Sequence, residues 1–457
     1  MIEKSVRWLL GVVVIVAGTV GLAACDRPGG DGRTAAAPAS SRSRNLVLVS
    51  LDTLRADRLG CYGHPLGTSP FIDALSRRAL TVVDVLAQNP STILSHRAIF
   101  TGRYVYQLDP GPARAEATLA GILSGRGYST AAFTDGGLMN EQYGNGPGFD
   151  VYDDSGGGFI PVMDRGMQWM DACTDGPFFL FLHTYDVHYP YTPPDPFADM
   201  FLPEGEPPYH LGADFGQDYW NRLALDRGGF EWISRRYDGG VRRTDADMMR
   251  LWSALAARGR LEDTVVVVMS DHGESLGERL YVGHRELYDV QLRVPLVLYP
   301  PVDRGFLLDG AVETIDILPT ILDMLGQSPG PAGSGTSLIP PVAARSMLSR
   351  SRHRLSETGA RAFRTDAEWK IILRENESLD ELYRMSQDEE ETMNLAGTFP
   401  EKAAELRQAL SAFIGMSAPE LRRNCDQRQI PVMLRAREEE SGEDRLMEQL
   451  RKLGYIE

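Results

Sequence analysis

Residues 45–52 read NLVLVSLD, a nearly continuous apolar run that ends on an aspartate. Similar apolar runs occur at residues 129–133, 178–183, 264–270 and 294–299. Short apolar runs without polar alternation are typical of strands that are covered on both faces. Helical patterns and turn signals separate the runs, which favours a parallel sheet. We therefore expect an α/β fold, with a mostly parallel sheet sandwiched by helices.

The polar residues at the ends of these runs carry the chemistry. Asp52 follows the first run, His183 ends the third, and Asp271 and His272 follow the fourth. The carboxyl ends of parallel strands meet at one edge of a sheet, where open α/β folds bind ligands. Two carboxylates and an imidazole at that edge favour a divalent cation. The alternative is that each polar group only caps the helix after its strand.

A second segment, residues 89–103, reads NPSTILSHRAIFTGR. Its pattern predicts a helix with Thr92 near the N-terminus. The helix dipole and unpaired N–H groups at such an end attract an anion, so a hydroxyl there can act as the nucleophile toward a charged ester. The alternative is that the threonine is an ordinary N-cap.

Charge and composition limit the class of partner. Lys and Arg number 47 and Asp and Glu 63, so the 457-residue chain has a formal net charge of −16. Binding to nucleic acid needs a clustered excess of basic residues, so we do not expect it as a partner. The hydrophobic and charged fractions are those of a folded globular protein, and the length allows a large α/β domain with a smaller satellite.

The first 25 residues are expected to form an export signal. Lys4 and Arg7 precede an uncharged apolar run at residues 8–24, shorter than the roughly 20 residues that span a bilayer. The sequence LAAC, ending at Cys25, resembles a bacterial lipobox; a permanent anchor helix is the alternative. We therefore expect a lipid-anchored protein of the bacterial cell envelope. Asp26 resembles an inner-membrane retention signal and favours the periplasmic face of that membrane.

Composition also divides the rest of the chain. Residues 26–44, rich in Gly, Ala, Pro, Ser and Arg, predict a flexible linker. We assign residues 45–330 to a catalytic domain and residues 331–457 to a smaller α+β subdomain, because a Pro/Gly/Ser-rich stretch lies at their junction. The subdomain is expected to contain a hairpin-type unit and an amphipathic helix at residues 401–414.

Three cysteines are left once Cys25 is acylated, namely Cys61, Cys173 and Cys425. An odd number cannot pair completely within one chain. At most one disulfide is expected, and three unpaired thiols are the alternative.

Several motifs occur in a recognisable order. They are LDTLRADRLGCYG at 51–63, DVHYPY at 186–191, SDHGE at 270–274, His284, RVP at 293–295 and IDILPTIL at 315–322. In order and spacing they resemble the sulfatase family of the alkaline phosphatase superfamily, from residue 45 to the end of the chain. The resemblance implies an alkaline phosphatase-like fold and a hydrolase that acts on phosphoric or sulfuric esters.

The resemblance also implies roles for single residues. It implies one divalent metal ion (Ca, Mn or Mg) held by Asp52, Asp271, His272 and Thr92. By the same resemblance, His188 and His284 contact the charged oxygens or the leaving group of the substrate as catalytic residues. Thr53 stands where many sulfatases have a second aspartate, so one metal is the simpler expectation, although a second is not excluded.

The chain departs from the family at the nucleophile. Sulfatases convert a Cys or Ser to formylglycine within a motif that also needs Pro and Arg, and here Thr92, Leu94 and His96 occupy those positions. Formylglycine is therefore not expected. In this feature the chain resembles threonine-using lipoteichoic acid synthases and phosphoethanolamine transferases of the same superfamily. We predict that Thr92 favours phosphoester or phosphodiester substrates, by hydrolysis or transfer.

Further residues are candidates for substrate binding, namely His96, Arg97 and His183. The alternatives are that His96 and Arg97 lie on a helix surface and that His183 is only a strand-end residue. Two other functions also stay open: a sulfuric ester hydrolase, and a non-catalytic lipoprotein that binds an anionic ligand. The expected substrate is an anionic ester, such as an envelope glycan or lipid.

Overall fold

The computed structural model describes residues 45–109, 111–173, 175–205, 227–300, 307–308, 312–328, 333–339, 353–358, 360–365, 368–374, 379–417 and 420. The predicted export signal, Cys25, the predicted linker and Cys425 lie outside this part of the chain. Within it, no helix combines the length and the apolar character needed to cross a membrane. Cys61 and Cys173 are free thiols.

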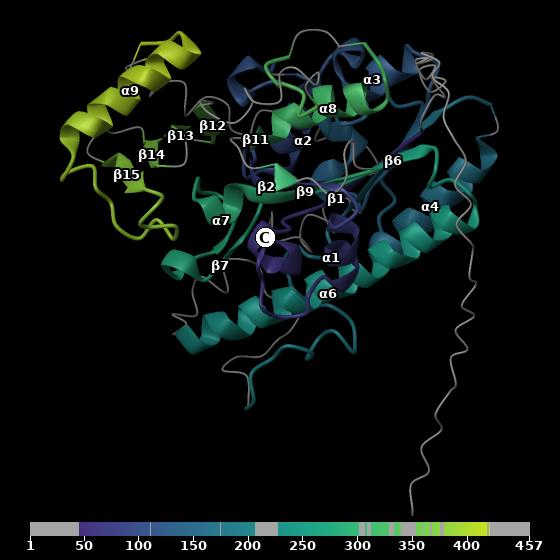
Figure 1. Cartoon of the computed structure of the whole chain (residues 1–457), viewed down its shortest axis with the longest axis horizontal. Helices are drawn as coiled ribbons and strands as arrows, with labels where there is room; N and C mark the ends of the chain where they lie inside the picture. Colours follow the sequence, from purple (N-terminus) through teal and green to yellow (C-terminus); the bar gives the residue numbers. More distant parts are fainter. Residues whose placement is uncertain are drawn as a thin grey trace, which may run out of the picture. The chain divides into compact units, whose positions relative to one another are not determined.

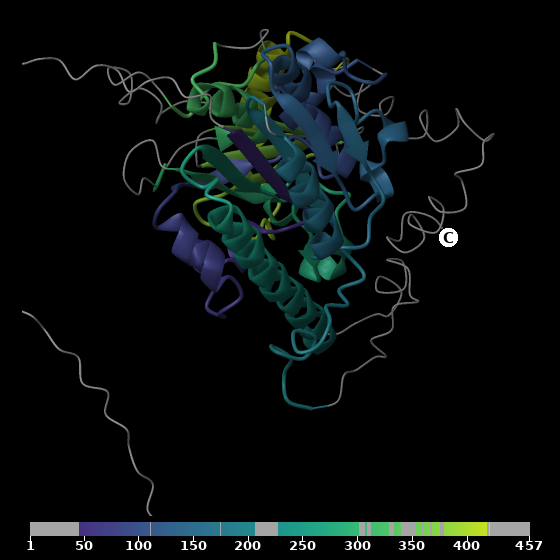
Figure 2. The ribbon, with the colours of Figure 1, turned by 90° about the vertical axis from the view of Figure 1, so that its right-hand side faces the viewer.

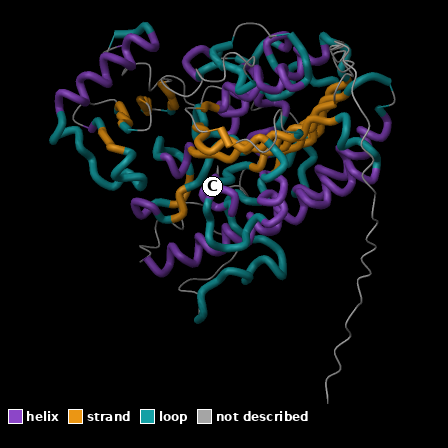
Figure 3. Tube along the Cα trace, in the orientation of Figure 1, coloured by secondary structure: helices purple, strands orange, loops and turns teal. Residues whose placement is uncertain are grey.

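In the described part of the chain, a nine-stranded sheet forms the centre of the fold (Figures 1 and 3). Its strands are β1 (Asn45–Leu51), β2 (Leu80–Leu86), β3 (Ser129–Phe133), β4 (Val151–Asp153), β5 (Phe178–Thr184), β6 (Thr264–Met269), β9 (Arg293–Tyr299), β10 (Leu307–Leu308) and β11 (Val312–Glu313). Their order is β10-β2-β9-β6-β1-β5-β3-β4, and β11 also pairs with β2. All five predicted strands are present, whereas β2, β4, β10 and β11 were not predicted.

The sheet is mostly parallel, as predicted, but one predicted strand runs the other way. β9 is antiparallel to both β6 and β2, whereas β1 is parallel to β5 and β6. The connection from β6 to β9 contains the hairpin strands β7 (Ser275–Leu276) and β8 (Val282–Gly283) and the short helix α7 (Asp289–Leu292), with no long crossover helix. An apolar run reports burial on both faces and carries no information on direction.

Helices cover both faces of the sheet (Figures 1 and 2). They are α1 (Pro70–Ser76), α2 (Thr92–Thr101), α3 (Leu119–Ser124), α4 (Phe159–Ala172), α6 (Arg227–Ala257) and α8 (Ile317–Met324). Along β1, Leu46 and Leu48 belong to the core beneath α2, α3 and α8, while Val47 and Val49 belong to the core with α1, α4 and α6. Side chains of a strand point alternately to its two faces, so one apolar run supplies both cores.

A separate antiparallel sheet lies near the C-terminal end of the described chain. Its strands are β12 (His353–Glu357), β13 (Arg361–Thr365), β14 (Trp369–Leu373) and β15 (Glu381–Arg384), and α9 (Pro400–Ile414) packs on them. Leu406 and Leu410 of α9 are buried, which confirms the predicted amphipathic helix. The predicted hairpin-type unit is part of this four-stranded sheet.

Candidate active site

The carboxyl ends of three adjacent strands bring the first group of polar residues together. β1 lies between β5 and β6, and Ser50 is level with His183 on one side and with Met269 on the other. Asp52 and Asp271 each follow this level by two residues. Equal offsets along parallel strands place side chains at the same edge of a sheet. The sheet register therefore brings Asp52, His183 and Asp271 together, as the strand-end pattern predicts.

Asp52, Asp271 and His272 form a compact group, here called the aspartate trio. Each offers one ligand atom, these atoms lie within 4.8 Å of one another, and all three residues are fully buried. None of them caps a helix in the described chain, because the next helical turns begin at Ala56 and Glu278. The helix-capping alternative is not supported.

The aspartate trio fits a divalent cation. Oδ1 of Asp52 and Oδ2 of Asp271 are buried and accept no hydrogen bond from any described residue. Burial raises the pKa of Asp52 to about 6, and burial together with Asp52 raises the pKa of Asp271. A buried carboxylate oxygen without a donor is unfavourable unless a cation reaches it, and each of these two carboxylates has one such oxygen. Two such carboxylates and an imidazole are ligands for a hard or borderline metal.

His272 has a defined orientation. Its Nδ1–H donates to the carbonyl of Gly273 at 3.0 Å, so Nε2 is the ring nitrogen that is left for a metal ion. That Nε2 lies 3.3 Å from Oδ2 of Asp271 and 3.4 Å from Oγ1 of Thr92. Burial lowers the pKa of His272, but the charges of Asp271 and Asp52 outweigh this and raise it. A cation among these ligands would displace the proton that the two carboxylates otherwise favour.

Thr92 is the first residue of α2 and is fully buried. Ser91 is the N-cap residue, and its side chain makes no capping hydrogen bond. The N-cap alternative for Thr92 is therefore not supported. Its hydroxyl instead lies beside the aspartate trio at the N-terminus of a ten-residue helix, an end that attracts anions.

Thr53 connects the ends of two strands. Its φ of 59° lies in the left-handed region, which is rare for a β-branched residue. The Thr53 N–H donates to Oδ1 of Asp271 at 3.4 Å, and its carbonyl accepts from the Tyr237 hydroxyl at 2.7 Å. Such strain is typical of functional sites, where surrounding contacts hold it in place.

Two of the predicted substrate-binding residues support the aspartate trio. His183 Nε2–H donates to Oδ2 of Asp52 at 3.1 Å. His96 Nδ1–H donates to the carbonyl of Thr92 at 2.8 Å, and its Nε2 accepts from the Ser50 hydroxyl at 2.9 Å. Burial lowers the pKa of both histidines to about 4, so they are neutral. These contacts are those of positioning residues, and the predicted contact of both histidines with the substrate stays a prediction.

Arg97 does not join this group. Its guanidinium donates to the carbonyls of Asp109 and Gly111, in the segment after α2. It therefore stabilises that segment, and its contacts give no support to the predicted role in substrate binding.

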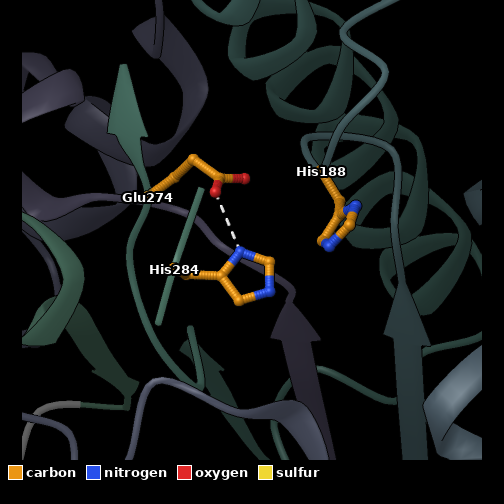
Figure 4. A group of neighbouring side chains, drawn as sticks. All are labelled: His188, Glu274 and His284. Atoms are coloured by element: carbon orange, nitrogen blue, oxygen red, sulfur yellow. Dashed lines mark hydrogen bonds and ion pairs between the residues drawn. The ribbon is translucent and has the colours of Figure 1, made fainter. Parts of the chain in front are cut away.

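A second group lies next to the first and consists of His188, Glu274 and His284 (Figure 4). All three are buried, and their ligand atoms also lie within 4.8 Å of one another. The ring centroids of His284 and His272 are 4.5 Å apart, and those of His284 and His188 are 5.1 Å apart. The sheet edge thus carries two adjacent groups of metal-ligating residue types, here called the aspartate trio and the histidine trio.

Burial governs the charge of the histidine trio. It lowers the pKa of His188 to about 3 and that of His284 well below its usual value, and neighbouring imidazoles act in the same direction. Burial raises the pKa of Glu274 to about 7. Glu274 was not predicted to be a site residue, although it stands in the SDHGE motif. The available signal was its position two residues after a predicted metal ligand.

Comparison of the sequence with known proteins identifies the family. The sequence model described as Sulfatase matches residues 44–327. The chain is 27% identical over 206 residues to the multifunctional alkaline phosphatase superfamily protein PehA of Trinickia caryophylli, covering 39% of this chain and 40% of PehA. It is 23% identical over 458 residues to an arylsulfatase of Clostridium perfringens, covering 80% of this chain and 93% of that protein.

The fold has close structural counterparts. The phosphonate monoester hydrolase of Agrobacterium radiobacter superposes with a TM-score of 0.67 at 18% identity, covering 81% of this chain and 95% of that one. At this identity the likeness concerns the fold alone, and it agrees with the expected α/β architecture. The match to PehA spans less than half of either protein, so the similarity there is local.

Proposed function

Because this chain belongs to the sulfatase family, we propose that it is a metal-dependent hydrolase or transferase of anionic esters, with Thr92 as the nucleophile. We further propose that its substrates are phosphoesters or phosphodiesters. The observation that carries the proposal is the position of Thr92. Its buried Oγ1 lies 3.4 Å from Nε2 of His272, a member of the aspartate trio.

The proposed reaction has two steps. When bound by Asp52, Asp271 and His272, a divalent cation supplies positive charge that favours the Thr92 alkoxide and offsets the charge of the ester. Thr92 Oγ1 attacks phosphorus, an Oγ1–P bond forms, and the bond from phosphorus to the leaving oxygen breaks. The Thr92 hydroxyl gives up one proton and the leaving oxygen takes up one, so the leaving group departs as an alcohol with no net change in protons. Water or an acceptor alcohol then breaks the Oγ1–P bond and restores Thr92.

Other residues of the chain hold this arrangement in place. The N-terminus of α2 carries a partial positive charge that favours the non-bridging oxygens of the phosphoryl group. His183 orients Asp52, and His96 fixes the first turn of α2 against β1. We place His188 and His284 on the side of the charged oxygens or leaving group of the substrate, because they border the aspartate trio through His272.

A sulfuric ester hydrolase is the second candidate. The similarity to an arylsulfatase over most of both chains favours it. The nucleophile argues for the phosphoester instead, because a formylglycine hydrate expels sulfate by collapsing to its aldehyde and a threonine sulfate has no such exit. The third candidate, a non-catalytic binder, is less favoured because it does not explain why a buried hydroxyl lies beside a group of metal-ligating residues.

Turnover of matched esters tests the proposal. Soluble protein starting at Asp26 is supplied in turn with Mn²⁺, Ca²⁺ or Mg²⁺ and assayed with an aryl phosphate, an aryl phosphodiester and an aryl sulfate. We expect phosphoester turnover to dominate and to fall on the order of 10³-fold or more in Thr92→Ala. Thr92→Ser, which keeps the hydroxyl, and Ser91→Ala, which removes the neighbouring one, are the matched controls.

The outcomes separate the candidates. Dominant sulfate turnover would show that the argument from the nucleophile is wrong. Unchanged turnover in Thr92→Ala would remove Thr92 from the reaction. Bound metal without turnover of any ester would favour the non-catalytic binder.

We also propose that the protein acts in the bacterial cell envelope, anchored through a lipid on Cys25, on an anionic glycan or lipid. The LAAC sequence that ends at Cys25 supports this proposal. Labelling cells with a palmitate analogue should mark the full-length protein and leave Cys25→Ala unlabelled. Equal labelling of both would contradict the anchor.

A further inference from the structure

The segment that carries His284 has no regular secondary structure of its own. β8 ends at Gly283 and α7 begins at Asp289, so residues 284–288 connect the two. At the start of this connection, His284 Nδ1–H donates to Oε1 of Glu274 at 2.8 Å (Figure 4). Backbone outside strands and helices is held by its side-chain contacts. The position of His284 therefore depends on the contacts that hold this segment.

Arg374 holds the segment from the C-terminal sheet. It follows β14, and its guanidinium donates to Oε2 of Glu286 at 2.7 Å and to the Tyr288 hydroxyl at 3.4 Å. The same guanidinium donates to Oε1 of Glu381, the first residue of β15, at 2.6 Å. Oε2 of Glu381 accepts from the Tyr288 hydroxyl at 2.8 Å. Two residues shortly after His284 are thus joined to two adjacent strands of that sheet.

The hydrogen bonds of Arg374 constrain geometry more than they add stability. A guanidinium is a planar fork, so donating to two carboxylates and a hydroxyl fixes the directions of all three. The side chains of Arg374 and Glu286 are 23% and 38% exposed, and ion pairs that water reaches contribute little to stability. Burial lowers the pKa of Arg374, but its bonds to Glu286 and Glu381 outweigh this and raise it. The guanidinium therefore keeps its charge and its partners.

A second contact holds the same segment from the hairpin. The Arg279 guanidinium lies over the ring of Tyr288, 3.9 Å from its centroid, and donates to the Tyr383 hydroxyl at 2.8 Å. Tyr383 lies in β15, so residues on both sides of His284 contact one strand of the C-terminal sheet. The φ of Arg279 is 56°, a left-handed conformation that surrounding contacts must hold in place.

We infer that Arg374 is a positioning residue for His284. Through Glu286 and Tyr288 it holds the connection from β8 to α7, and this connection keeps the His284 ring centroid 4.5 Å from that of His272. The inference deepens the proposed function and rests on it for what His284 does to a substrate. The placement of His284 itself can be measured without a substrate, so the two can fail separately.

The NMR signal of the His284 Nδ1–H proton tests this placement directly. The full-length protein is labelled with ¹⁵N-histidine and loaded with Mg²⁺, and the signal is identified by its loss in His284→Gln. We expect the signal to shift or broaden in Arg374→Met, because the ring moves relative to Glu274. It should stay as in the wild type in the matched control Arg384→Met. Arg384 belongs to the same sheet and forms an ion pair with Glu368 at 2.7 Å.

A second variant keeps the test decisive if Arg374→Met does not fold. Glu286→Gln neutralises the partner of Arg374 in the segment and leaves the guanidinium in place. It should move the His284 signal in the same direction as Arg374→Met. An unchanged signal in the folded variants of this pair would overturn the inference.

A double-mutant cycle shows whether Arg374 acts through His284. Arg374→Met should lower kcat for an aryl phosphate on the order of 10-fold, because a small displacement of a group near the reacting atoms is costly. In the His284→Gln background the same change should lower kcat no further. An equal loss in both backgrounds would mean that Arg374 only joins the two sheets, and would overturn the inference. No turnover of any ester by the wild type would instead contradict the proposed function, and the NMR signal would then decide the inference alone.

Discussion

Buried carboxylates occur in two regions of this protein, with opposite surroundings. Near the C-terminal sheet, Asp289 accepts from Lys370 Nζ at 2.6 Å and from Arg364 Nη1 at 2.8 Å. These two cations hold its pKa well below the usual range, despite burial. At the candidate active site, no lysine or arginine of the described chain forms an ion pair with Asp52 or Asp271, and burial raises the pKa of both.

The difference separates a carboxylate that is neutralised within the protein from carboxylates that are proposed to bind a metal ion. Asp289 precedes β9 of the central sheet, while Arg364 and Lys370 belong to β13 and β14, so this ion pair joins the two sheets. Its charges are balanced within the chain. Among the described residues, no lysine or arginine pairs with the carboxylates of the aspartate trio, and carboxylates without such a partner suit a metal ion. The four predictions that follow test this contrast, from the largest expected effect to the smallest.

The largest effect is expected from Asp271→Asn. Loss of this carboxylate should remove the metal of the aspartate trio and lower kcat/KM for the preferred ester on the order of 10³-fold. Elemental analysis and steady-state kinetics measure both effects. Asp263→Asn, at the opposite end of β6, is the control and should change neither. Full activity of Asp271→Asn would contradict the proposal that the carboxylates of the aspartate trio bind a metal ion needed for the reaction.

The next effect concerns stability and comes from Asp289→Asn. Removing one partner leaves Lys370 and Arg364 buried with less compensating charge, which should cost about 3–5 kcal/mol of unfolding free energy. Denaturant titration measures it, and bound metal should be unchanged. The control is Asp171→Asn, whose exposed pair with Arg258 should be worth less than about 1 kcal/mol. Equal losses at both positions would contradict a structural role for Asp289.

Bound metal should raise the unfolding free energy of the protein through the aspartate trio and not through Asp289. At a free concentration 100 times the Kd, a cation bound to the folded state adds about 2.7 kcal/mol of unfolding free energy. We expect this gain in the wild type and in Asp289→Asn, and its loss in Asp52→Asn. Thermal unfolding with and without Mn²⁺ measures it. A gain retained in Asp52→Asn would place the stabilising cation elsewhere.

The smallest effect is a pH dependence at Glu313, a buried carboxyl outside both trios. Burial raises its pKa from 4.5 to about 7, so its contribution to stability is complete below about pH 4.5 and is lost as pH rises through 7. Glu313→Gln mimics the protonated carboxyl. Its stability relative to the wild type should therefore increase by about 1 kcal/mol between pH 6 and 8.

Denaturant titrations at several pH values test this prediction. Glu401→Gln, at an exposed position of α9, is the control and should show no trend over the same range. A flat difference for Glu313→Gln would mean that the carboxyl is ionised in the folded state. Metal should not change the trend, because Glu313 belongs to neither trio.

Much of the fold and part of the site could be predicted because their signals are local. Apolar runs identified β1, β3, β5, β6 and β9, and the residues directly after β1 and β6 include the aspartate trio. The sulfatase family and the mostly parallel fold are confirmed. The direction of β9 could not be predicted, because the pairing of a strand depends on its connection and not on its own composition.

The sequence alone determined the chemistry that is available: a threonine at a helix start, carboxylates and imidazoles at strand ends, and no motif for formylglycine. Tertiary structure decided how those residues are arranged. It placed His96 behind Thr92, turned Arg97 away, and aligned Glu274 with His284 across a hairpin. Local spacing carries the first kind of information. The second depends on register and on contacts between segments far apart in the chain, which no short stretch of sequence encodes.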